Sequence, residues 1–349
     1  MLGLTALTPG ATPLEALRRI ALLLERSRAG TYRVQAFRSA ADLIARMPSD
    51  ELASRVESGT LEDLPGIGAS TAAVVTEAAH GELPAYLSSL QEKHSGFLAP
   101  GGEDLYAVLR GDLHSHSDWS DGGSSIQEMV LAAVEFGQDW MALTDHSPRL
   151  KVARGLSAER LTQQIGVVDA INSALGERFR LLRGIEVDIL DDGSLDQDPS
   201  LLERLDIVTA SVHSKLRMAR GAMTTRMLAA VRNPRVNVLG HATGRLVEGS
   251  RGTRPQSEFD AVTVFGECAA NNVAVEINSR PERCDPPDDL IRVALDAGCL
   301  FAIDSDAHAP GQLDMKAYGA ERATRLGVPV DRIVTTWSAD RVVEWAAER

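Results

Sequence analysis

The sequence has little cysteine and little lysine. The first scarcity limits disulfides and thiolate metal sites, and the second limits the source of positive charge. Its three cysteines, Cys268, Cys284 and Cys299, form no C-x-x-C pair, so neither a disulfide framework nor a thiolate zinc site is indicated. We interpret them as small core residues. Lysine occurs four times in 349 residues, so arginine supplies nearly all of the positive charge.

Long apolar runs and a basic leader are also missing. No stretch reaches the roughly 18 apolar residues of a membrane span, and the opening MLGLTALTPGATP has no basic region followed by an apolar run. We therefore expect a cytoplasmic protein without membrane contact, and we assume a monomer. The net charge of −13 argues against broad attraction to nucleic acid, so any DNA binding must be local.

The first ninety or so residues have the pattern of helices. Thr12, Pro13 and Glu15 predict a capped helix start, and apolar residues then recur at helical spacing. Further on, Gly66, Ile67 and Gly68 form a glycine turn that opens another helix, where free N–H groups suit a phosphate. We predict a small all-α domain over residues 1–93 and a glycine-rich linker over residues 94–108.

Residues 109–349 alternate between short β-rich runs and helical segments. The runs are WMALTDH, RLLRGIEVDIL, LDIVTASVH, VNVLGH, NVAVEINS and LFAIDSDAH. Such alternation predicts parallel strands joined by crossover helices, hence an α/β fold that is either a barrel or a doubly wound sheet.

Polar residues gather at the carboxyl ends of these runs. Parallel strand ends meet on one face, so residues about 190 positions apart in the sequence can become neighbours there. Six of the eight histidines follow this rule, each near a carboxylate. The candidate metal ligands are His114, His116, Asp121, His146, Glu186, His213, His241, Asp306 and His308.

Imidazole and carboxylate without thiolate suit Zn²⁺, Mn²⁺ or Fe²⁺. The candidates exceed one tetrahedral shell, which favours a multi-metal site that can activate water and hold both oxygens of a displacement at phosphorus. Three divalent ions against the charges of Asp121, Glu186 and Asp306 would leave about +3 to receive a phosphate in an acidic protein.

These residues occur in the ordered motifs DLHSHSDWSDG, TDH, RGIEVDI, SVHS, LGHATGR, EINSRPERCD and IDSDAH. The motifs resemble those of the PHP phosphoesterases, above all the PHP domain of bacterial family X DNA polymerases, over residues 109–345. The resemblance implies a distorted (β/α)7 barrel, the PHP fold, with three divalent metal ions. By motif, His114, His116, Glu186 and Asp306 would hold one ion; Glu186 would bridge to a second held by His213 and His241; and Asp121, His146 and His308 would hold the third.

Other residues of these motifs have supporting interpretations. Asp145 is expected to support a ligating histidine through a hydrogen bond without itself binding the metal. Lys215, Arg245 and Arg283 are candidates for binding substrate phosphate, with a structural charge as the alternative. Glu276 and Asn278 are expected to hold the barrel together, and His80 and His94 to lie at the surface.

The N-terminal motifs YRVQAFRSAA and LPGIG resemble the helix-hairpin-helix, lyase-like domain of family X polymerases. The palm, fingers and thumb are absent, so we expect no polymerase activity. The Schiff-base lysine of the lyase family would fall at Val74, and residues 1–92 contain no lysine. What is left is the hairpin at Gly66, Ile67 and Gly68 as a DNA-backbone clamp, or alternatively a packing module.

The sequence thus predicts a metal-dependent phosphoesterase, a hydrolase that attacks a DNA 3′ end as a 3′–5′ exonuclease or end-processing repair enzyme. The first alternative is a small-molecule phosphatase of the histidinol-phosphate type. A further alternative is a metal-dependent amidohydrolase, but such an enzyme uses a bridging modified lysine, and this chain has Glu186 at that place. A noncatalytic DNA-binding adaptor would not need the complete ligand set.

Overall fold

The chain forms two compact units, Met1–Phe97 and Leu98–Arg349. The computed structural model describes residues 4–94, 96–249 and 252–348. Within residues 94–108, expected as a linker, the short helix α6 (Glu103–Tyr106) places Leu105 in the core of the larger unit. The domain bounds derived from sequence stay a prediction.

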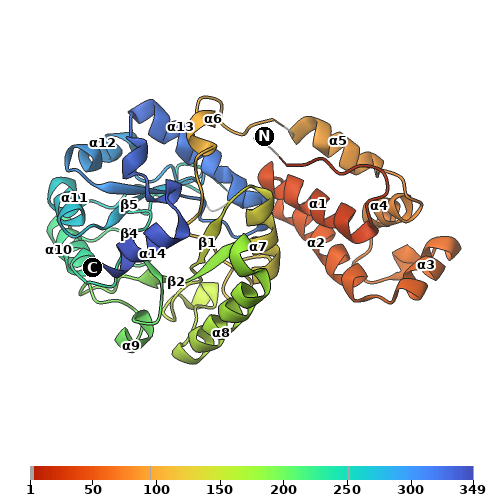
Figure 1. Cartoon of the computed structure of the whole chain (residues 1–349), viewed down its shortest axis with the longest axis horizontal. Helices are drawn as coiled ribbons and strands as arrows, with labels where there is room; N and C mark the ends of the chain where they lie inside the picture. Colours follow the sequence, from red (N-terminus) through yellow and green to blue (C-terminus); the bar gives the residue numbers. More distant parts are fainter. Residues whose placement is uncertain (1–3, 95, 250–251, 349) are drawn as a thin grey trace. The chain divides into compact units, whose positions relative to one another are not determined.

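The smaller unit is helical, as predicted (Figure 1). Its elements are α1 (Pro13–Arg26), α2 (Thr31–Arg46), α3 (Ser49–Ser58), the 3-10 turn η1 (Leu61–Asp63), α4 (Ala69–Ala79) and α5 (Ala85–His94). The predicted capping box begins α1: the Thr12 hydroxyl accepts the Glu15 N–H, and the Glu15 carboxylate accepts the Thr12 N–H. Leu17 and Leu24 of α1 pack in one core with Val75 of α4, which gives this unit its own hydrophobic centre.

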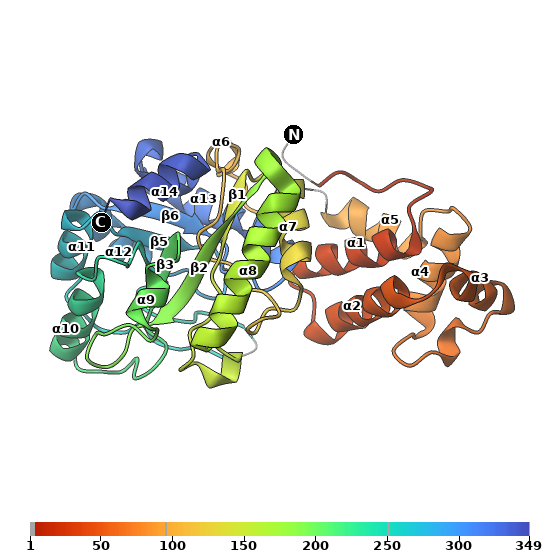
Figure 2. The ribbon, with the colours of Figure 1, turned by 60° about the horizontal axis from the view of Figure 1, so that its bottom comes forward.

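The larger unit contains a parallel sheet whose strand order follows the sequence (Figures 1 and 2). Its strands are β1 (Trp140–Leu143), β2 (Arg180–Asp188), β3 (Ile207–Ser211), β4 (Val238–Leu239), β5 (Ala274–Asn278) and β6 (Leu300–Asp304). Every neighbouring pair is parallel, and each β-rich run picked out from the sequence contains one strand.

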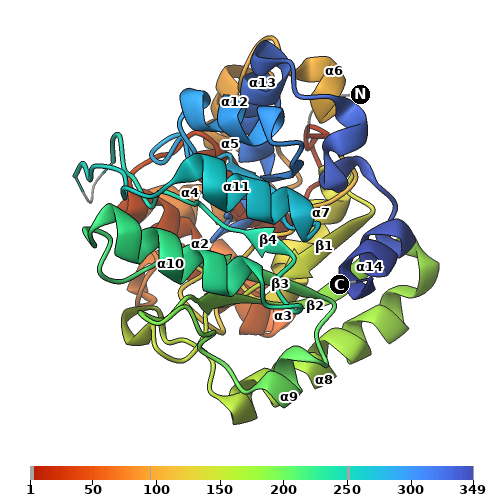
Figure 3. The same ribbon diagram turned by 90° about the vertical axis from the view of Figure 1, so that its left-hand side faces the viewer.

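Helices lie around the outside of the strands, as Figure 3 shows for α8 and α10 to α13. The helices of this unit after α6 are α7 (Ile126–Glu135), α8 (Ala158–Leu175), α9 (Pro199–Leu202), α10 (Arg220–Val231), α11 (Ala261–Ala270), α12 (Asp288–Asp296), α13 (Lys316–Leu326) and α14 (Ala339–Ala347). Their apolar faces and the outward side chains of the strands form the main core, in which Met227, Phe265 and Ile291 are fully buried. The α/β barrel architecture predicted from the sequence is confirmed.

Residues 112–116 close the gap between the two edge strands. The Ala142 N–H donates to Asp112 O and the Thr144 N–H to Ser115 O on the β1 side. On the β6 side Ser115 forms a parallel bridge with Ala307. This segment therefore takes the seventh place around the barrel without being a regular strand, and it brings His114 and His116 inside.

Inward-facing positions of the barrel change from apolar to polar along the strands. One cluster of apolar residues, closed by Trp345 of α14, contains Leu182, Ala274 and Ala302. Two or four residues further along the same strands stand Glu186, Glu276 and Asp304, all buried. Since side chains two apart share a face of a strand, the carboxyl ends must present polar groups to the interior.

Within the described residues, no helix is long and apolar enough to cross a membrane.

Candidate metal centre

All nine candidate ligands lie together at the carboxyl ends of the barrel strands. Three groups of their donor atoms lie within 4.8 Å of one another: His116, Asp121, His146 and His308; His114, His116 and Glu186; and His146, Glu186 and His213. His241 joins them through Glu186, and Asp306 through His116. The structure brings together the residues that the strand-end pattern selected.

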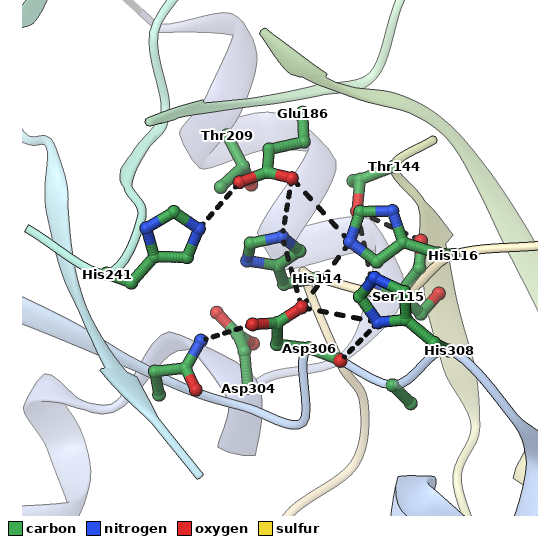
Figure 4. Close-up of polar contacts among 12 residues, drawn as sticks. His114, Ser115, His116, Thr144, Glu186, Thr209, His241, Asp304, Asp306 and His308 are labelled. Atoms are coloured by element: carbon green, nitrogen blue, oxygen red, sulfur yellow. Dashed lines mark hydrogen bonds and ion pairs between the residues drawn. The ribbon is translucent and has the colours of Figure 1, made fainter. Parts of the chain in front are cut away.

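Glu186, near the end of β2, has more histidine contacts than the other carboxylates of the cluster, and Figure 4 shows those to His114, His116 and His241. Five imidazole nitrogens approach its carboxylate: His241 Nε2 at 2.8 Å, His146 Nδ1 at 2.8 Å, His213 Nε2 at 3.1 Å, His114 Nε2 at 3.3 Å and His116 Nε2 at 3.6 Å. The Glu186 side chain is fully buried. One carboxylate surrounded in this way can share its two oxygens between neighbouring cations.

The other two carboxylates approach the cluster from the loops. Asp121 Oδ1 lies 3.4 Å from His146 Nε2 and 3.4 Å from His308 Nε2. Asp306 Oδ1 lies 3.5 Å from His116 Nε2. Asp306 has a positive φ of 50°, an uncommon conformation that aspartate tolerates better than most residues and that often marks a functional position.

Several donor atoms of the cluster are buried without a hydrogen bond. In the described part of the chain these atoms include His114 Nε2, both ring nitrogens of His116 and His213, His146 Nδ1, His241 Nδ1 and both oxygens of Glu186. Buried polar atoms normally have partners, and orphaned ones need an explanation such as an ion. Convergent imidazole and carboxylate lone pairs fit divalent metals, so the cluster is compatible with metal binding.

Burial and the charges of neighbouring side chains shift the pKa values of the cluster in opposite directions. Burial opposes charge on His116 and, with the neighbouring rings of His308 and His146, lowers its pKa to about 3. Burial also opposes charge on His146, but the Glu186 and Asp121 carboxylates prevail and raise its pKa to about 10. Although burial favours the neutral acid, the rings of His114, His213 and His146 hold the pKa of Glu186 well below its usual range. The neutral His116 ring and the ionised Glu186 are already in the protonation states that bind metal, whereas His146 has to lose its proton on binding.

The buried carboxylate that supports His114 is Glu276, on β5. Glu276 Oε1 lies 2.6 Å from His114 Nδ1, and its other oxygen accepts the backbone N–H of His241. From the sequence we expected Glu276 only to hold the barrel together. Its position two residues before Asn278, at the polar end of an inward-facing row, was the available signal.

Asp145 instead supports a loop. Its carboxylate accepts hydrogen bonds from the Ser117 N–H and hydroxyl, from the Ser120 hydroxyl and from Gln164 Nε2. These contacts fix the turn that leads into Asp121. They differ from the direct support of a ligating histidine that we expected from its place beside His146.

The three candidate phosphate-binding residues lie in different surroundings. Arg283 lines the cleft over the metal cluster, with its Nε 2.9 Å from Asp306 Oδ2. The guanidinium of Arg245 donates to the carbonyls of Arg283 and Cys284 and lines another cavity. Lys215 pairs with Asp191 at 2.5 Å. Arg254, which sequence reasoning missed, also lines the cleft.

In the smaller unit, two hairpin N–H groups are already used. The Ile67 N–H donates to Leu64 O at 3.1 Å, and the Gly68 N–H donates to Thr71 Oγ1 at 3.0 Å. Gly66 has a φ of 91°, which favours glycine. His80 is exposed and His94 half-buried, at the ends of α4 and α5.

Parts of both units match known protein families. Residues 112–280 match the PHP domain family and residues 9–82 a helix-hairpin-helix domain family. The DNA polymerase/3′-5′ exonuclease PolX of Bacillus subtilis is 41% identical over 217 residues, which cover 62% of this chain and 37% of PolX. A probable phosphatase of Photobacterium profundum is 26% identical over 245 residues, covering 65% of this chain and 89% of that protein.

Among solved structures, the histidinol phosphate phosphatase of Lactococcus lactis, complexed with zinc, L-histidinol and phosphate, is 17% identical. It superposes with a TM-score of 0.42 over 58% of this chain and 87% of that one.

The matching relatives are thus named as a 3′-5′ exonuclease and as a probable phosphatase, both enzymes that hydrolyse phosphate esters. The chain is therefore similar to a PHP domain over residues 112–280 and to a helix-hairpin-helix domain over residues 9–82, the combination that the sequence motifs indicate.

Proposed function

We propose that the barrel is a metal-dependent phosphoesterase that holds three divalent ions and hydrolyses phosphodiesters at the 3′ end of DNA. The observation that carries the proposal is the convergence of nine imidazole and carboxylate side chains, many with buried donor atoms that lack a hydrogen bond; six of the nine line the same cleft as Arg283. Zn²⁺, Mn²⁺ and Fe²⁺ all suit this donor set.

Each ion has its own residues in this proposal. His114, His116, Glu186 and Asp306 would hold the first; His213 and His241, together with Glu186, would hold the second; Asp121, His146 and His308 would hold the third. The shared approach of His146 and His308 to Asp121 Oδ1, each at 3.4 Å, supports the third set. When bound, such ions activate water and neutralise charge on the reacting phosphate.

The protein's own residues position the substrate. Arg283 is buried, and its contact with Asp306 keeps the guanidinium beside the metal residues, where it can bind a phosphate oxygen. The loop fixed by Asp145 places Asp121 at the edge of the cluster, since Asp121 is the most exposed carboxylate of the set. The site therefore has a buried side that holds ligands and an open side that admits the ester.

DNA is the preferred substrate because PolX is named as a 3′–5′ exonuclease and because a helix-hairpin-helix domain precedes the barrel. The match covers 37% of PolX, so we propose the exonuclease activity for this chain by similarity to that part. A small phosphomonoester is the second candidate. It is favoured by the probable phosphatase, which matches over 89% of its length with no second domain required.

A substrate panel on the metal-reconstituted full chain separates the two candidates. Single-stranded DNA, duplex DNA, a DNA 3′-phosphate and histidinol phosphate are compared, with Glu186→Gln as the control for contaminating activity. Release of mononucleotides from DNA supports the exonuclease proposal. Release of inorganic phosphate only, and only from histidinol phosphate, overturns it in favour of the small-molecule phosphatase.

A further inference from the structure

The cleft over the metal cluster has a wall that the phosphoester chemistry does not use. The cleft has a volume of about 290 Å³, and one side is formed by the polar residues already described. The remaining lining includes five aliphatic side chains: Leu150, Val152, Ala153, Val212 and Leu216. We call these five residues the aliphatic ledge.

The ledge is partly open to solvent beside the metal residues, since Ala153 and Val212 are buried and the other three side chains are not. Val152 is 91% exposed, the highest value among the large hydrophobic residues that the structure describes, equalled by Tyr32, and Leu150 and Leu216 are partly exposed. Apolar surface in water is unfavourable, and exposed apolar groups that line a cleft often mark a ligand surface. A ligand bound in the cleft would cover Val152 and remove its apolar surface from water.

The turn that carries Val152 is firmly held. It is the 3-10 turn η2 (Lys151–Ala153), followed by Arg154 in the left-handed conformation, at a φ of 56°. The Arg154 guanidinium donates to the carbonyls of Asp118 and Ser120 in the loop before Asp121. Arg160 donates in turn to the carbonyls of Arg154 and Trp119. The turn that carries Leu150, Val152 and Ala153 is thus tied to the Asp121 loop, so this part of the ledge keeps a set position beside the metal residues.

We propose that the aliphatic ledge binds the nucleobase of the terminal nucleotide whose phosphate lies at Arg283 and the metal cluster. This inference rests on the proposed DNA function. The cleft is at the small end of ligand sites, which run from about 300 to 1,000 Å³, so it suits one nucleotide unit. A small hydrophilic ester would leave Val152 in water, whereas the flat face of a base covers it.

The aliphatic side chains of the ledge also determine how a nucleobase would be recognised. Every base has an apolar face, and a wall of valine, leucine and alanine side chains has no hydrogen-bonding group that reads base edges. The ledge therefore accepts all four bases and discriminates between the presence and the absence of a base.

The test uses two oligonucleotides that differ only in the 3′-terminal residue, thymidine in one and a tetrahydrofuran abasic residue in the other. The metal-reconstituted full chain is assayed for first-nucleotide release as wild type, Val152→Asp and Val152→Thr. The matched control is Val262→Asp, since Val262 is 69% exposed on α11 outside the cleft lining. Metal content and thermal unfolding of each variant verify that the site and the fold are intact.

Wild type and Val262→Asp should release the terminal thymidine nucleotide about tenfold more efficiently, in kcat/KM, than the terminal abasic nucleotide. Val152→Asp should lose about tenfold on the thymidine end and little on the abasic end, so that the two substrates become equal; Val152→Thr should fall between. Equal rates for the two ends with wild type, or an equal loss on both with Val152→Asp, would overturn the ledge while leaving the DNA activity standing. If wild type cleaves neither oligonucleotide but hydrolyses small phosphomonoesters, the DNA function itself fails and the ledge inference falls with it.

Discussion

Glu276 and His114 form a buried pair, with Oε1 of the carboxylate 2.6 Å from Nδ1 of the ring. Both side chains are completely buried. Although burial opposes charge on His114, the Glu186 and Glu276 carboxylates raise its pKa, so the ring has to lose one proton before it can bind a metal ion. A carboxylate at Nδ1 keeps a proton on that nitrogen, so Nε2, which faces Glu186 at 3.3 Å, is the nitrogen freed for the ion. The pair therefore prepares His114 to bind a metal ion through one defined nitrogen.

Replacing Glu276 with glutamine should weaken metal binding because the amide no longer fixes the tautomer of His114. Loss of such an outer contact typically costs about ten- to a hundredfold in metal affinity. Chelator titration of the reconstituted protein, followed by elemental analysis, measures the change. Glu344→Gln, exposed on α14, is the control that should leave affinity unchanged. Equal affinities in the two variants would contradict the role of Glu276.

Glu186→Ala and Asp145→Ala should differ in how many ions they lose. Glu186 is the proposed bridge among five imidazole rings, so its removal should abolish activity and lower the bound metal by more than one ion per chain. Asp145 fixes only the loop before Asp121, so its removal should cost at most one ion and leave partial activity. Elemental analysis and initial rates check both. Similar retention of activity in the two variants would sink the assignment.

Strand-end positions made the core of the candidate site predictable. A parallel barrel brings its carboxyl ends together, so Glu186 and His213 could be placed side by side from residue pattern alone. The roles of Asp145 and Glu276 could not, because they depend on which buried donor each carboxylate meets. Glu276 meets a ring 162 residues away, and Asp145 turns toward Ser117 although His146 follows it directly in the chain.

The fold was predictable for a similar reason, with one local exception. Alternation located all six strands, but residues 112–116 lack regular strand geometry and are recognised only through their hydrogen bonds to β1 and to Ala307. The hairpin shows the same limit. Its glycines are visible in the sequence, whereas the capture of the Gly68 N–H by the Thr71 hydroxyl depends on a side-chain conformation.

The chain should lack lyase activity at abasic sites. Val74, at the expected position of the nucleophile, is 1% exposed within the apolar core of the helical unit, so no amine is presented there. Borohydride trapping with an abasic oligonucleotide should yield no covalent adduct within residues 1–92. An adduct mapped to that region would show that another amine, such as the N-terminus, had taken over the reaction.

The hairpin should contribute to DNA binding through the start of α4 rather than through Ile67 and Gly68, whose N–H groups already have partners. Ser70 is exposed in the first turn of α4, where backbone N–H groups and the helix dipole favour a phosphate. Ser70→Glu adds a negative charge that the helix start tolerates well, so stability should hold while a phosphate is repelled. Ser54→Glu, exposed on α3, makes the same charge change away from the hairpin.

If the helical unit delivers DNA to the barrel, Ser70→Glu should weaken binding of a long single strand about three- to tenfold, because one of two linked contacts is lost. The dependence of binding on salt should also become shallower, since fewer phosphates are contacted. Hydrolysis of a small chromogenic phosphodiester should be the same in both variants and wild type, because it needs the barrel alone. Fluorescence anisotropy across a salt series measures the first two effects. If Ser70→Glu and Ser54→Glu bind DNA equally well, the helical unit is a packing or partner module instead of a DNA clamp.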